Sequence, residues 1–441
     1  MEAEEEMTNG VSVRELVLDI LMEVNEKEQY SHLVIRDVLN KYQYLEKQER
    51  AFLTRLAEGT IEHMLEMDFI INSFSKVKVK KMKPLIRNLL RMSVYQLKYM
   101  DAIPDAAVCN EAVKLAKKRG FGQLRGFVNG VLRNIAREVS HLQYPDERLE
   151  PVRYLEVVYS VPAWMVEQWI ADYGYEQAKG ICESFLKNRP ITIRTNLTKI
   201  TPAELKARLE EEQVCVVPVE TLEYAYEISG FDYLQSLESF QEGLFYVQDI
   251  SSMMVAEVAA PEKNSYIIDV CAAPGGKSSH LAEKMQGTGM VEARDLTEYK
   301  VSLIEENIQR HGLENMNAVQ MDATILDEAS VNKADVLICD LPCSGLGVMG
   351  KKTDIRYKMT AEKQKDLVQL QRQILSTVHA YVKPGGTMVY STCTIHKGEN
   401  EDNVAWFVKE YPEFEVLSKE QMFPGGIYHD GFFIAKLRRN R

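Results

Sequence analysis

The sequence predicts a three-part α/β protein: an all-α N-terminal domain, a small α+β module, and a C-terminal domain built on a mostly parallel sheet. Residues 11–139 place apolar side chains at spacings of three and four, with no strand pattern between them. Residues 162–219 mix helical and β-branched segments, and from about residue 240 β-rich apolar runs alternate with helical patterns. We place the three domains at 1–145, 146–235 and 236–441.

The first domain repeats the helical spacing along its whole length. The segments that carry it are 13–24, 52–71, 84–100, 108–120 and 127–139. Pro84 suits a first helical turn because its missing N–H is not needed there, and Gly120 suits a helix end. A bundle of five to seven helices is expected.

The later segments change in character twice. The small module has helical patterns at 162–174 and 202–212, and β patterns at 191–195 and 214–219. In the last domain, strands are expected at 266–270, 289–293, 317–321, 334–340 and 387–392. The helical patterns between and after them are 280–285, 301–312, a long helix ending at Val382, and 401–411. This alternation predicts βαβ units of a Rossmann-like sheet, and residues 425–439 predict a turn and a terminal strand.

Charge is unevenly distributed along the chain. The total of 53 Lys and Arg against 65 Asp and Glu gives −12, which by itself disfavours a polyanionic partner. Residues 1–70, however, carry a net charge of −9, and residues 71–140 a net charge of +11, with a dense basic run from Lys76 to Lys83. The run predicts a docking site for a phosphate-bearing partner, and the alternative is a set of solvated lysines on helix faces.

The chain shows no targeting or membrane signal. Its first seven residues are acidic, and no apolar run approaches the roughly 18 residues that a membrane span needs. We therefore expect a cytoplasmic protein with no membrane partner. Seven cysteines, an odd number in a long chain, predict reduced thiols, and Cys109, Cys182 and Cys215 are expected to be packing residues.

The strand at 266–270 runs into a loop of small residues and paired glycines, 271–277, followed by a helical segment. Such a loop lets a ligand approach the backbone, and the helix N-terminus offers free amides to an anionic group. A phosphate loop would need glycine where Cys271 stands, and the dinucleotide pattern is absent. Asp295, 19 residues after Gly276, suits ribose hydroxyls. A nucleoside with a carboxylate and no phosphates, such as S-adenosylmethionine, fits both features; the alternative is a purely structural turn.

Two more predicted strands end in reactive side chains. Asp340 and Cys343 follow one strand and Cys393 follows the other, so all three are expected at the same edge of the sheet as the glycine loop. A zinc site made of these cysteines with Cys339 and His396 is disfavoured, because strand alternation turns Cys339 away from Asp340 and no C-x2-C pair is present. The other possibility is thiolate addition to an electron-poor carbon beside a carboxylic acid.

These motifs resemble those of a known family. AAPGGK, DLPCSGLGV and YSTCTI, with the acidic turn at 399–401, are similar in order and spacing to three motifs of the RNA (cytosine-5) methyltransferases. Residues 127–134, FVNGVLRN, resemble the NusB-type RNA-binding fold, and residues 189–211 resemble the small module that precedes the catalytic domain. Nearly end to end, the chain resembles the bacterial 16S rRNA (cytosine-5) methyltransferases of the RsmB/Sun/Fmu type.

The resemblance implies a cofactor and a set of residue roles. S-adenosylmethionine would be the cofactor, and no metal is implied. The positions that match the family's cofactor contacts are Cys271, Ala272, Ala273, Pro274, Gly275, Gly276, Lys277, Asp295, Asp322 and Asp340. Cys393 matches the nucleophile that adds to C6 of cytosine, Asp340 the acid that protonates N3, and Cys343 the cysteine that assists release. Lys277 is also a candidate for contact with the base, and Arg356 for contact with the RNA backbone.

The implied function is methylation of C5 of one cytosine in 16S rRNA, at the cytosine-967-type position. The substrate would be naked rRNA or an early small-subunit particle, and the enzyme a monomer. Two cysteines favour RNA over DNA, because the DNA enzymes use one. Two alternatives stay open: an RNA cytosine-5 methyltransferase acting on tRNA or another rRNA site, and a non-catalytic RNA-binding factor of the NusB type.

Overall fold

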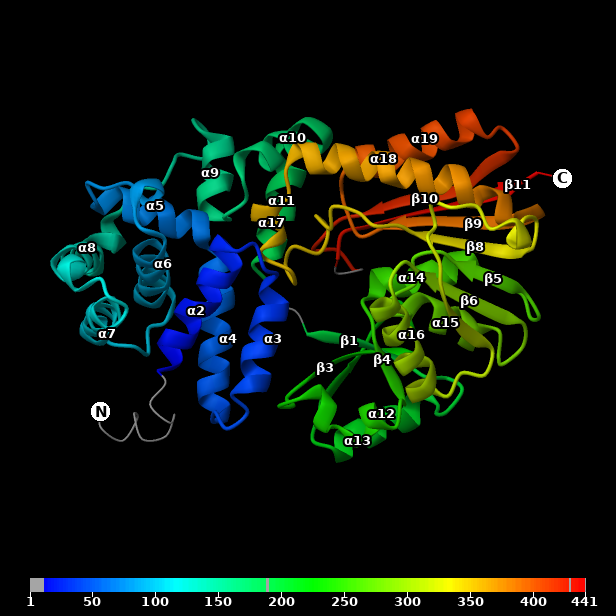
Figure 1. Cartoon of the computed structure of the whole chain (residues 1–441), viewed down its shortest axis with the longest axis horizontal. Helices are drawn as coiled ribbons and strands as arrows, with labels where there is room; N and C mark the ends of the chain where they lie inside the picture. The colour runs from blue at the N-terminus through cyan, green and yellow to red at the C-terminus, as the bar shows by residue number, and fades with distance from the viewer. Residues whose placement is uncertain (1–11, 188–189, 428–429, 441) are drawn as a thin grey trace. The chain divides into compact units, whose positions relative to one another are not determined.

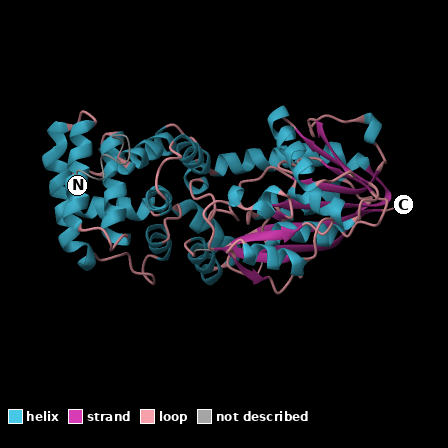
Figure 2. Ribbon diagram, turned by 90° about the horizontal axis from the view of Figure 1, so that it is seen from below, coloured by secondary structure: helices cyan, strands magenta, loops and turns pink. Residues whose placement is uncertain are grey.

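The chain forms two compact units in the computed structural model, which describes residues 12–187, 190–427 and 430–440. The first unit contains residues 1–186 together with 349–358, and the second contains residues 187–348 and 359–441. Helices make up the first unit, whereas strands and helices alternate in the second (Figures 1 and 2). The domain boundaries at 145 and 235 stay predictions.

Helices form the described part of the first unit, as expected for residues 12–145. They continue to Phe185, in a stretch that the sequence pattern assigns to the α+β module. The main helices of this unit are α2 (Val13–Glu26), α3 (Ser31–Lys41), α4 (Lys47–Glu62), α5 (Met64–Phe74), α6 (Pro84–Tyr99), α7 (Asp105–Lys118), α8 (Arg125–Glu138), α9 (Pro151–Val158), α10 (Ala163–Tyr173) and α11 (Tyr175–Phe185). Pro84 lies in the first turn of α6, and Gly120 follows the end of α7 with φ +85°, so both expected helix boundaries are confirmed.

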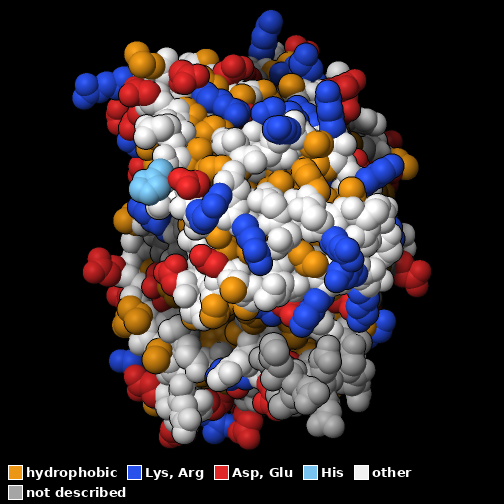
Figure 3. All heavy atoms as spheres, turned by 90° about the vertical axis from the view of Figure 1, so that its left-hand side faces the viewer, with side chains coloured by type: hydrophobic (Ala, Val, Ile, Leu, Met, Phe, Trp, Pro, Cys, Tyr) orange, Lys and Arg blue, Asp and Glu red, His pale blue; other side chains and the backbone are white. Residues whose placement is uncertain are grey.

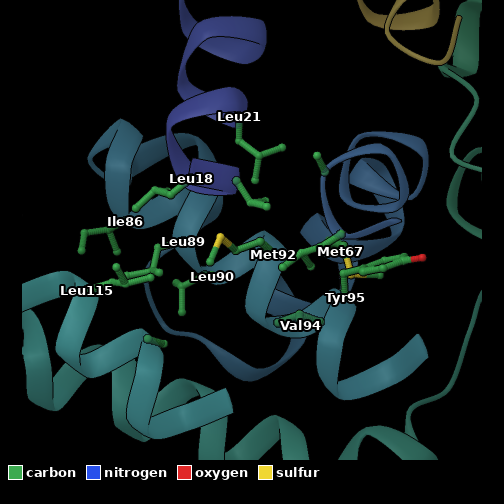
Figure 4. Packing of buried hydrophobic residues seen from close by; sticks show 14 of the residues in the cluster. Leu18, Leu21, Met67, Ile86, Leu89, Leu90, Met92, Val94, Tyr95 and Leu115 are labelled. Carbon is green, nitrogen blue, oxygen red and sulfur yellow. The ribbon is translucent and has the colours of Figure 1, made fainter. Parts of the chain in front are cut away.

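The core of this unit is formed where α2, α5, α6 and α7 meet. Leu18 and Leu21 from α2, Met67 from α5, Leu89 from α6 and Leu115 from α7 point into the same interior (Figure 4). Burying such side chains contributes roughly 1.5–3 kcal/mol each. The three-and-four spacing seen in the sequence is therefore the spacing of a helix-bundle core.

Ten residues from the C-terminal half of the chain, 349–358, belong to the helical unit. Arg356, in the short helix α17 (Ile355–Lys358), is fully buried and donates to the carbonyl oxygens of Glu62, Tyr159 and Ser160. Asp354 accepts hydrogen bonds from the N–H and hydroxyl of Ser31. The prediction that Arg356 holds the RNA backbone is wrong, because its guanidinium is enclosed by protein carbonyls.

Ion pairs within the helical unit join the acidic and basic stretches of the sequence. Pairs between residues 1–70 and 71–140 have N–O distances between 2.6 and 3.4 Å; they are Arg87–Glu26, Arg91–Asp68, Lys98–Glu66, Lys118–Glu15, Arg119–Glu15 and Arg119–Asp19. Five of the fifteen Lys and Arg residues in 71–140 are therefore paired with acids of the preceding stretch. These five are less available to the phosphate-bearing partner that the charge count predicts.

The small sheet of the second unit has four antiparallel strands in the order β2-β3-β1-β4. They are β1 (Ile191–Thr195), β2 (Cys215–Pro218), β3 (Ala225–Ser229) and β4 (Phe245–Val247), with α12 (Pro202–Glu211) and α13 (Glu238–Gln241) between them. Cys215 lies on the exposed edge strand β2, so its expected packing role is wrong, whereas Cys109 and Cys182 are buried as expected.

The large sheet has seven strands in the order β10-β11-β9-β8-β5-β6-β7, and β5 to β9 are parallel. Its strands are β5 (Tyr266–Asp269), β6 (Met290–Asp295), β7 (Met316–Gln320), β8 (Ala334–Asp340), β9 (Val382–Thr392), β10 (Phe414–Met422) and β11 (Phe432–Arg439). The chain moves outward from β5 to β7, then returns to place β8 and β9 on the other side of β5. This reversal between β5 and β8 is the point where α/β sheets bind ligands.

Helices alternate with the strands of the large sheet, which confirms the Rossmann-like fold. They are α14 (Ile250–Ala259), α15 (Gly276–Lys284), α16 (Glu298–His311), α18 (Ala361–Val378) and α19 (Glu401–Glu410). Strand β10 lacks an apolar alternation because most of its side chains are exposed, which explains why the sequence indicates a single terminal strand. No helix among the described residues is long and apolar enough to cross a membrane.

Candidate active site

The glycine loop follows β5 at the ligand-binding point of the sheet. Gly275 has φ +101° and precedes α15, so the loop turns where an L side chain would be strained. A Cβ at Gly276 would come within 3.1 Å of the ring of Tyr246. Small residues are therefore required for the backbone to fold tightly at the N-terminus of α15, whose first amides suit a carboxylate ligand.

Two buried acids, Asp269 and Asp295, form hydrogen bonds with the glycine loop and the helix that follows it. Ser278 donates to Asp269 at 2.6 Å, and burial raises the pKa of Asp269 to about 7. Asp295, at the end of β6, accepts from the N–H of Ala273 at 3.0 Å and from the ammonium of Lys300 at 2.9 Å. Its carboxylate thus holds the glycine loop to β6, and its expected contact with ribose stays a prediction.

The end of β6 carries a buried arginine, Arg294. Arg294 donates to Glu292 and to the hydroxyl of Ser330, and its guanidinium lies over the ring of Tyr381. Asp327 is its second acidic partner. The buried charge of Arg294 is therefore paired within the sheet and its flanking loops.

Asp322 follows β7 at the same edge of the sheet. Its Oδ1 accepts from the N–H of Thr324 at 2.8 Å and from the Thr324 hydroxyl at 2.6 Å. These bonds lower the pKa of Asp322, which therefore remains an ionised acceptor. Such a carboxylate suits the donor groups of a nucleoside.

Lys277 and Asp340 form an ion pair between α15 and the end of β8. Lys277 Nζ lies 2.7 Å from Asp340 Oδ2, and Ser391 donates to Asp340 Oδ1 at 2.8 Å. Burial alone would lower the pKa of Lys277, but Asp340 and the nearby Cys393 raise it overall. Lys277 is therefore a firmly charged group between the carboxylate and the thiol.

Cys343 and Cys393 lie side by side. Their Sγ atoms are 3.3 Å apart, although 50 residues separate them in the sequence. The hydrogen bond with Cys393, together with burial, raises the pKa of the Cys343 thiol. The structure thus brings together the three expected catalytic residues, Cys343, Cys393 and Asp340, at the carboxyl ends of β8 and β9.

Cys339, near the end of β8, is separate from the pair. Cys339 is fully buried in the apolar core beneath the sheet, and burial raises its pKa. Within the described ranges, His, Cys, Asp and Glu side chains form no cluster of three or more that could hold a metal ion. None of the seven cysteines forms a disulfide. The zinc alternative has no support from the geometry.

The helical unit carries a compact basic segment between α5 and α6, which we call the lysine segment. Its exposed lysines are Lys76, Lys78, Lys80, Lys81 and Lys83. Val79 and Met82 are buried beneath them and fix the backbone. Among the described residues, none of these five ammonium groups forms an ion pair, which leaves the charge available to a polyanion. Lys and Arg side chains are also spread over the face of this unit in Figure 3.

Glu399 is the residue whose importance the sequence pattern understates. It is fully buried and accepts hydrogen bonds from Ser344, beside Cys343, and from His396, near Cys393. The sequence marks it only as part of an acidic turn after YSTCTI. Its spacing of six residues from Cys393 is the one signal that could have singled it out.

Comparisons with known proteins agree with this arrangement. Residues 256–438 match the family model described as 16S rRNA methyltransferase RsmB/F, residues 11–137 match the NusB family, and residues 161–231 match the ferredoxin-like domain of RsmF/B-like methyltransferases. A probable ribosomal RNA small subunit methyltransferase B from Bacillus subtilis is 37% identical over 97% of this chain and 99% of its own length.

The chain belongs to the ribosomal RNA small subunit methyltransferase B family. A Synechocystis relative with the same name is 30% identical over 97% of this chain and 100% of its own length. The crystal structure of PH0851 covers 97% of this chain and 99% of its own, with a TM-score of 0.82 and 26% identity. S-adenosylmethionine is the cofactor of this methyltransferase family, and the glycine loop, the α15 amides and Asp322 fit such a ligand.

Proposed function

We propose that this chain methylates C5 of a specific cytosine in 16S rRNA through a covalent bond between Cys393 and C6 of the base. The observation that carries the proposal is the 3.3 Å approach of Cys343 and Cys393 beside the Lys277–Asp340 pair. C5 of cytosine is a weak nucleophile. A thiolate added at C6 turns the ring into an enamine, which makes C5 reactive.

The residues divide the reaction between them. The Cys393 sulfur forms the bond to C6 as its thiol proton is lost. That proton passes by way of the Lys277–Asp340 pair to N3, with Asp340 as the group that delivers it, and so prevents charge from building up on the ring. Bound S-adenosylmethionine supplies the methyl group that C5 attacks. The C5 proton then passes to water, the electron pair of the broken C–H bond restores the double bond as the C6–Sγ bond breaks, and the N3 proton returns to Asp340. Cys343, whose Sγ lies 3.3 Å from that of Cys393, would assist this last step.

Binding of the cofactor rests on the edge of the sheet around β5. The proposed contacts are residues 271–277 with Asp295, Asp322 and Asp340, where acidic side chains and the amides of α15 supply acceptors and donors. The substrate proposal rests on the named relatives and on the lysine segment, whose charges suit an RNA backbone. A flipped base would reach the thiols at the strand ends.

Methyl transfer to a panel of RNAs tests the proposal. The protein is incubated with labelled S-adenosylmethionine and, side by side, unmodified 16S rRNA, small subunits, 23S rRNA or tRNA, and the labelled base is mapped. Label at C5 of one cytosine in 16S rRNA is expected. Label confined to tRNA or 23S rRNA would favour the alternative substrates. RNA binding with no methyl transfer to any of them would favour a non-catalytic factor.

A further inference from the structure

Glu399 lies beneath the two cysteine loops, in a short 3-10 turn at Lys397–Glu399. Its side chain is fully buried. One carboxylate oxygen accepts from the Ser344 hydroxyl at 2.5 Å and lies 3.1 Å from His396 Nδ1. The other accepts from the Ser344 N–H at 2.8 Å and from Gln371 Nε2 at 3.0 Å. We call Glu399 with Ser344, Gln371 and His396 the carboxylate clasp.

The clasp reaches both sides of Cys343. Ser344 follows the cysteine in the chain, and Gln371, from α18, also donates to the carbonyl of Pro342 at 2.8 Å. Pro342 and Ser344 are thus both held by groups that meet at Glu399. The loop that carries Cys343 has little freedom to move while Glu399 accepts these bonds.

The clasp also reaches the loop of Cys393. Thr394, the next residue, shares a hydrogen bond of 2.7 Å with the Ser344 hydroxyl. Asn400, next to Glu399, donates to the Thr394 carbonyl at 3.0 Å and is bonded to Thr392 at 2.6 Å. The residues on either side of Cys393 are therefore fixed by the same turn that holds Ser344.

A carboxylate suits this position because its two oxygens can accept about four hydrogen bonds. An apolar side chain of the same size would leave buried donors from three segments of chain without a partner. A buried carboxylate is not needed for packing an apolar core. The hydrogen bonds of Glu399 join the two segments that carry the thiols to α18.

We propose that Glu399 is a positioning residue that sets the distance between the Cys343 and Cys393 thiols. The hydrogen bonds of Glu399 are sufficient to argue that it holds the two thiols close together. The effect of Glu399 on turnover rests, in addition, on the proposed function. If the release step needs Cys343 close to the C6–Sγ bond, loosening the clasp slows release more than bond formation. A displacement near 1 Å can cost about 100-fold in rate.

The geometry is tested with dibromobimane, a short reagent that becomes fluorescent when two neighbouring thiolates have each displaced one bromide. The full-length protein should cross-link Cys343 to Cys393, with Cys343→Ala and Cys393→Ala defining the background from the other five cysteines. Glu399→Ala should fall to that background. Glu399→Gln should keep most of the signal, because the Ser344 hydroxyl and His396 can both accept from an amide. Asp402→Asn, an exposed acid on α19, is the matched control and should leave the signal unchanged.

The catalytic readout separates positioning from general damage. Glu399→Ala should lower turnover by about 10- to 100-fold, leave the Kd for S-adenosylmethionine unchanged and accumulate a covalent protein–RNA adduct. A merely unfolded protein would form less adduct. If Glu399→Ala does not fold, Ser344→Ala removes the hydroxyl that bonds to Glu399 and Thr394 but keeps the backbone N–H bond to Glu399, and it should give the same changes in milder form. Wild-type cross-linking in a folded Glu399→Ala variant overturns the proposal. Full activity of Cys393→Ala would instead overturn the proposed function and leave the cross-linking result intact.

Discussion

Lys277 Nζ and Asp340 Oδ2 lie 2.7 Å apart at the carboxyl ends of the neighbouring strands β5 and β8, so the first turn of α15 and the end of β8 are joined by opposite charges. The pair is partly enclosed, with 17% and 23% of the two side chains exposed. Cys393 is close enough to influence the same lysine. One cation therefore connects the cofactor loop, the proposed acid and the proposed nucleophile.

Lys277→Met should weaken both stability and methyl transfer, because Asp340 then loses its cationic partner while its hydrogen bond from Ser391 stays. A double-mutant cycle of Lys277→Met with Asp340→Asn, measured by urea unfolding, should give a coupling energy of about 1–2 kcal/mol. Turnover should fall in both single variants. A coupling energy of zero would show that the two side chains do not interact in solution.

Cys343→Ala should accumulate a covalent enzyme–RNA adduct, because Cys393 can still add to C6 while the release step lacks its assisting thiol. The adduct is measured as a slowly migrating band on a denaturing gel. Cys393→Ala is the matched control, and it should form no band and transfer no methyl groups. Normal turnover by Cys343→Ala without a band would refute this division of labour between the two thiols.

Replacing the five lysines of the lysine segment by Glu should weaken RNA binding and flatten its salt dependence. Each lost phosphate contact should reduce the slope of log K against log salt concentration by roughly one. The matched control replaces five exposed lysines of the second unit by Glu: Lys263, Lys333, Lys365, Lys409 and Lys419. An equal effect of both sets would mean that the lysine segment only adds to overall charge.

The fold, and the edge of the sheet at which the proposed active site lies, could be predicted from short sequence patterns. Pro84 marked the start of α6, and the residues after β5, β8 and β9 were expected at one edge because parallel strands end together. Contacts between distant segments were beyond reach. Arg356 is held by carbonyls from residues 62 and 159–160, and the clasp on Glu399 needs α18 to be in place.

The distribution of charge on the folded protein could also not be predicted from the sequence alone. A count along the sequence assigns a net charge of +11 to residues 71–140. In the structure, however, Arg87, Arg91 and Arg119 form ion pairs with acidic residues of the preceding stretch. Helix packing decides which charges face each other, and that information is absent from a linear count. Strand β10 was missed because an exposed edge strand has no apolar alternation to detect.

Glu66 should make the protein sensitive to acid. Burial alone would raise its pKa, but hydrogen bonds from His63, Lys98 and Tyr99 lower it to about 2. A carboxyl whose pKa is depressed on folding contributes stability above its unfolded value of 4.5, and that stability is lost as pH falls from about 4.5 toward 2. The contribution is about 3 kcal/mol at neutral pH. Urea unfolding of Glu66→Gln should therefore differ from wild type at pH 7, and the difference should shrink below pH 4.5 and vanish only near pH 2; a difference that stays constant over this range would exclude this origin.

Arg356→Lys should destabilise the protein while leaving the salt dependence of RNA binding unchanged. A single ammonium cannot reproduce the fork of the guanidinium, which donates to carbonyls of three different residues, so buried acceptors lose their partners. The expected loss is about 2–3 kcal/mol in the free energy of unfolding. Arg137→Lys, on the exposed side of α8, is the control and should change stability by no more than about 0.5 kcal/mol. If Arg356→Lys kept full stability and instead reduced the salt slope, the arginine would contact RNA, and its buried position within the helical unit would not describe the protein in solution.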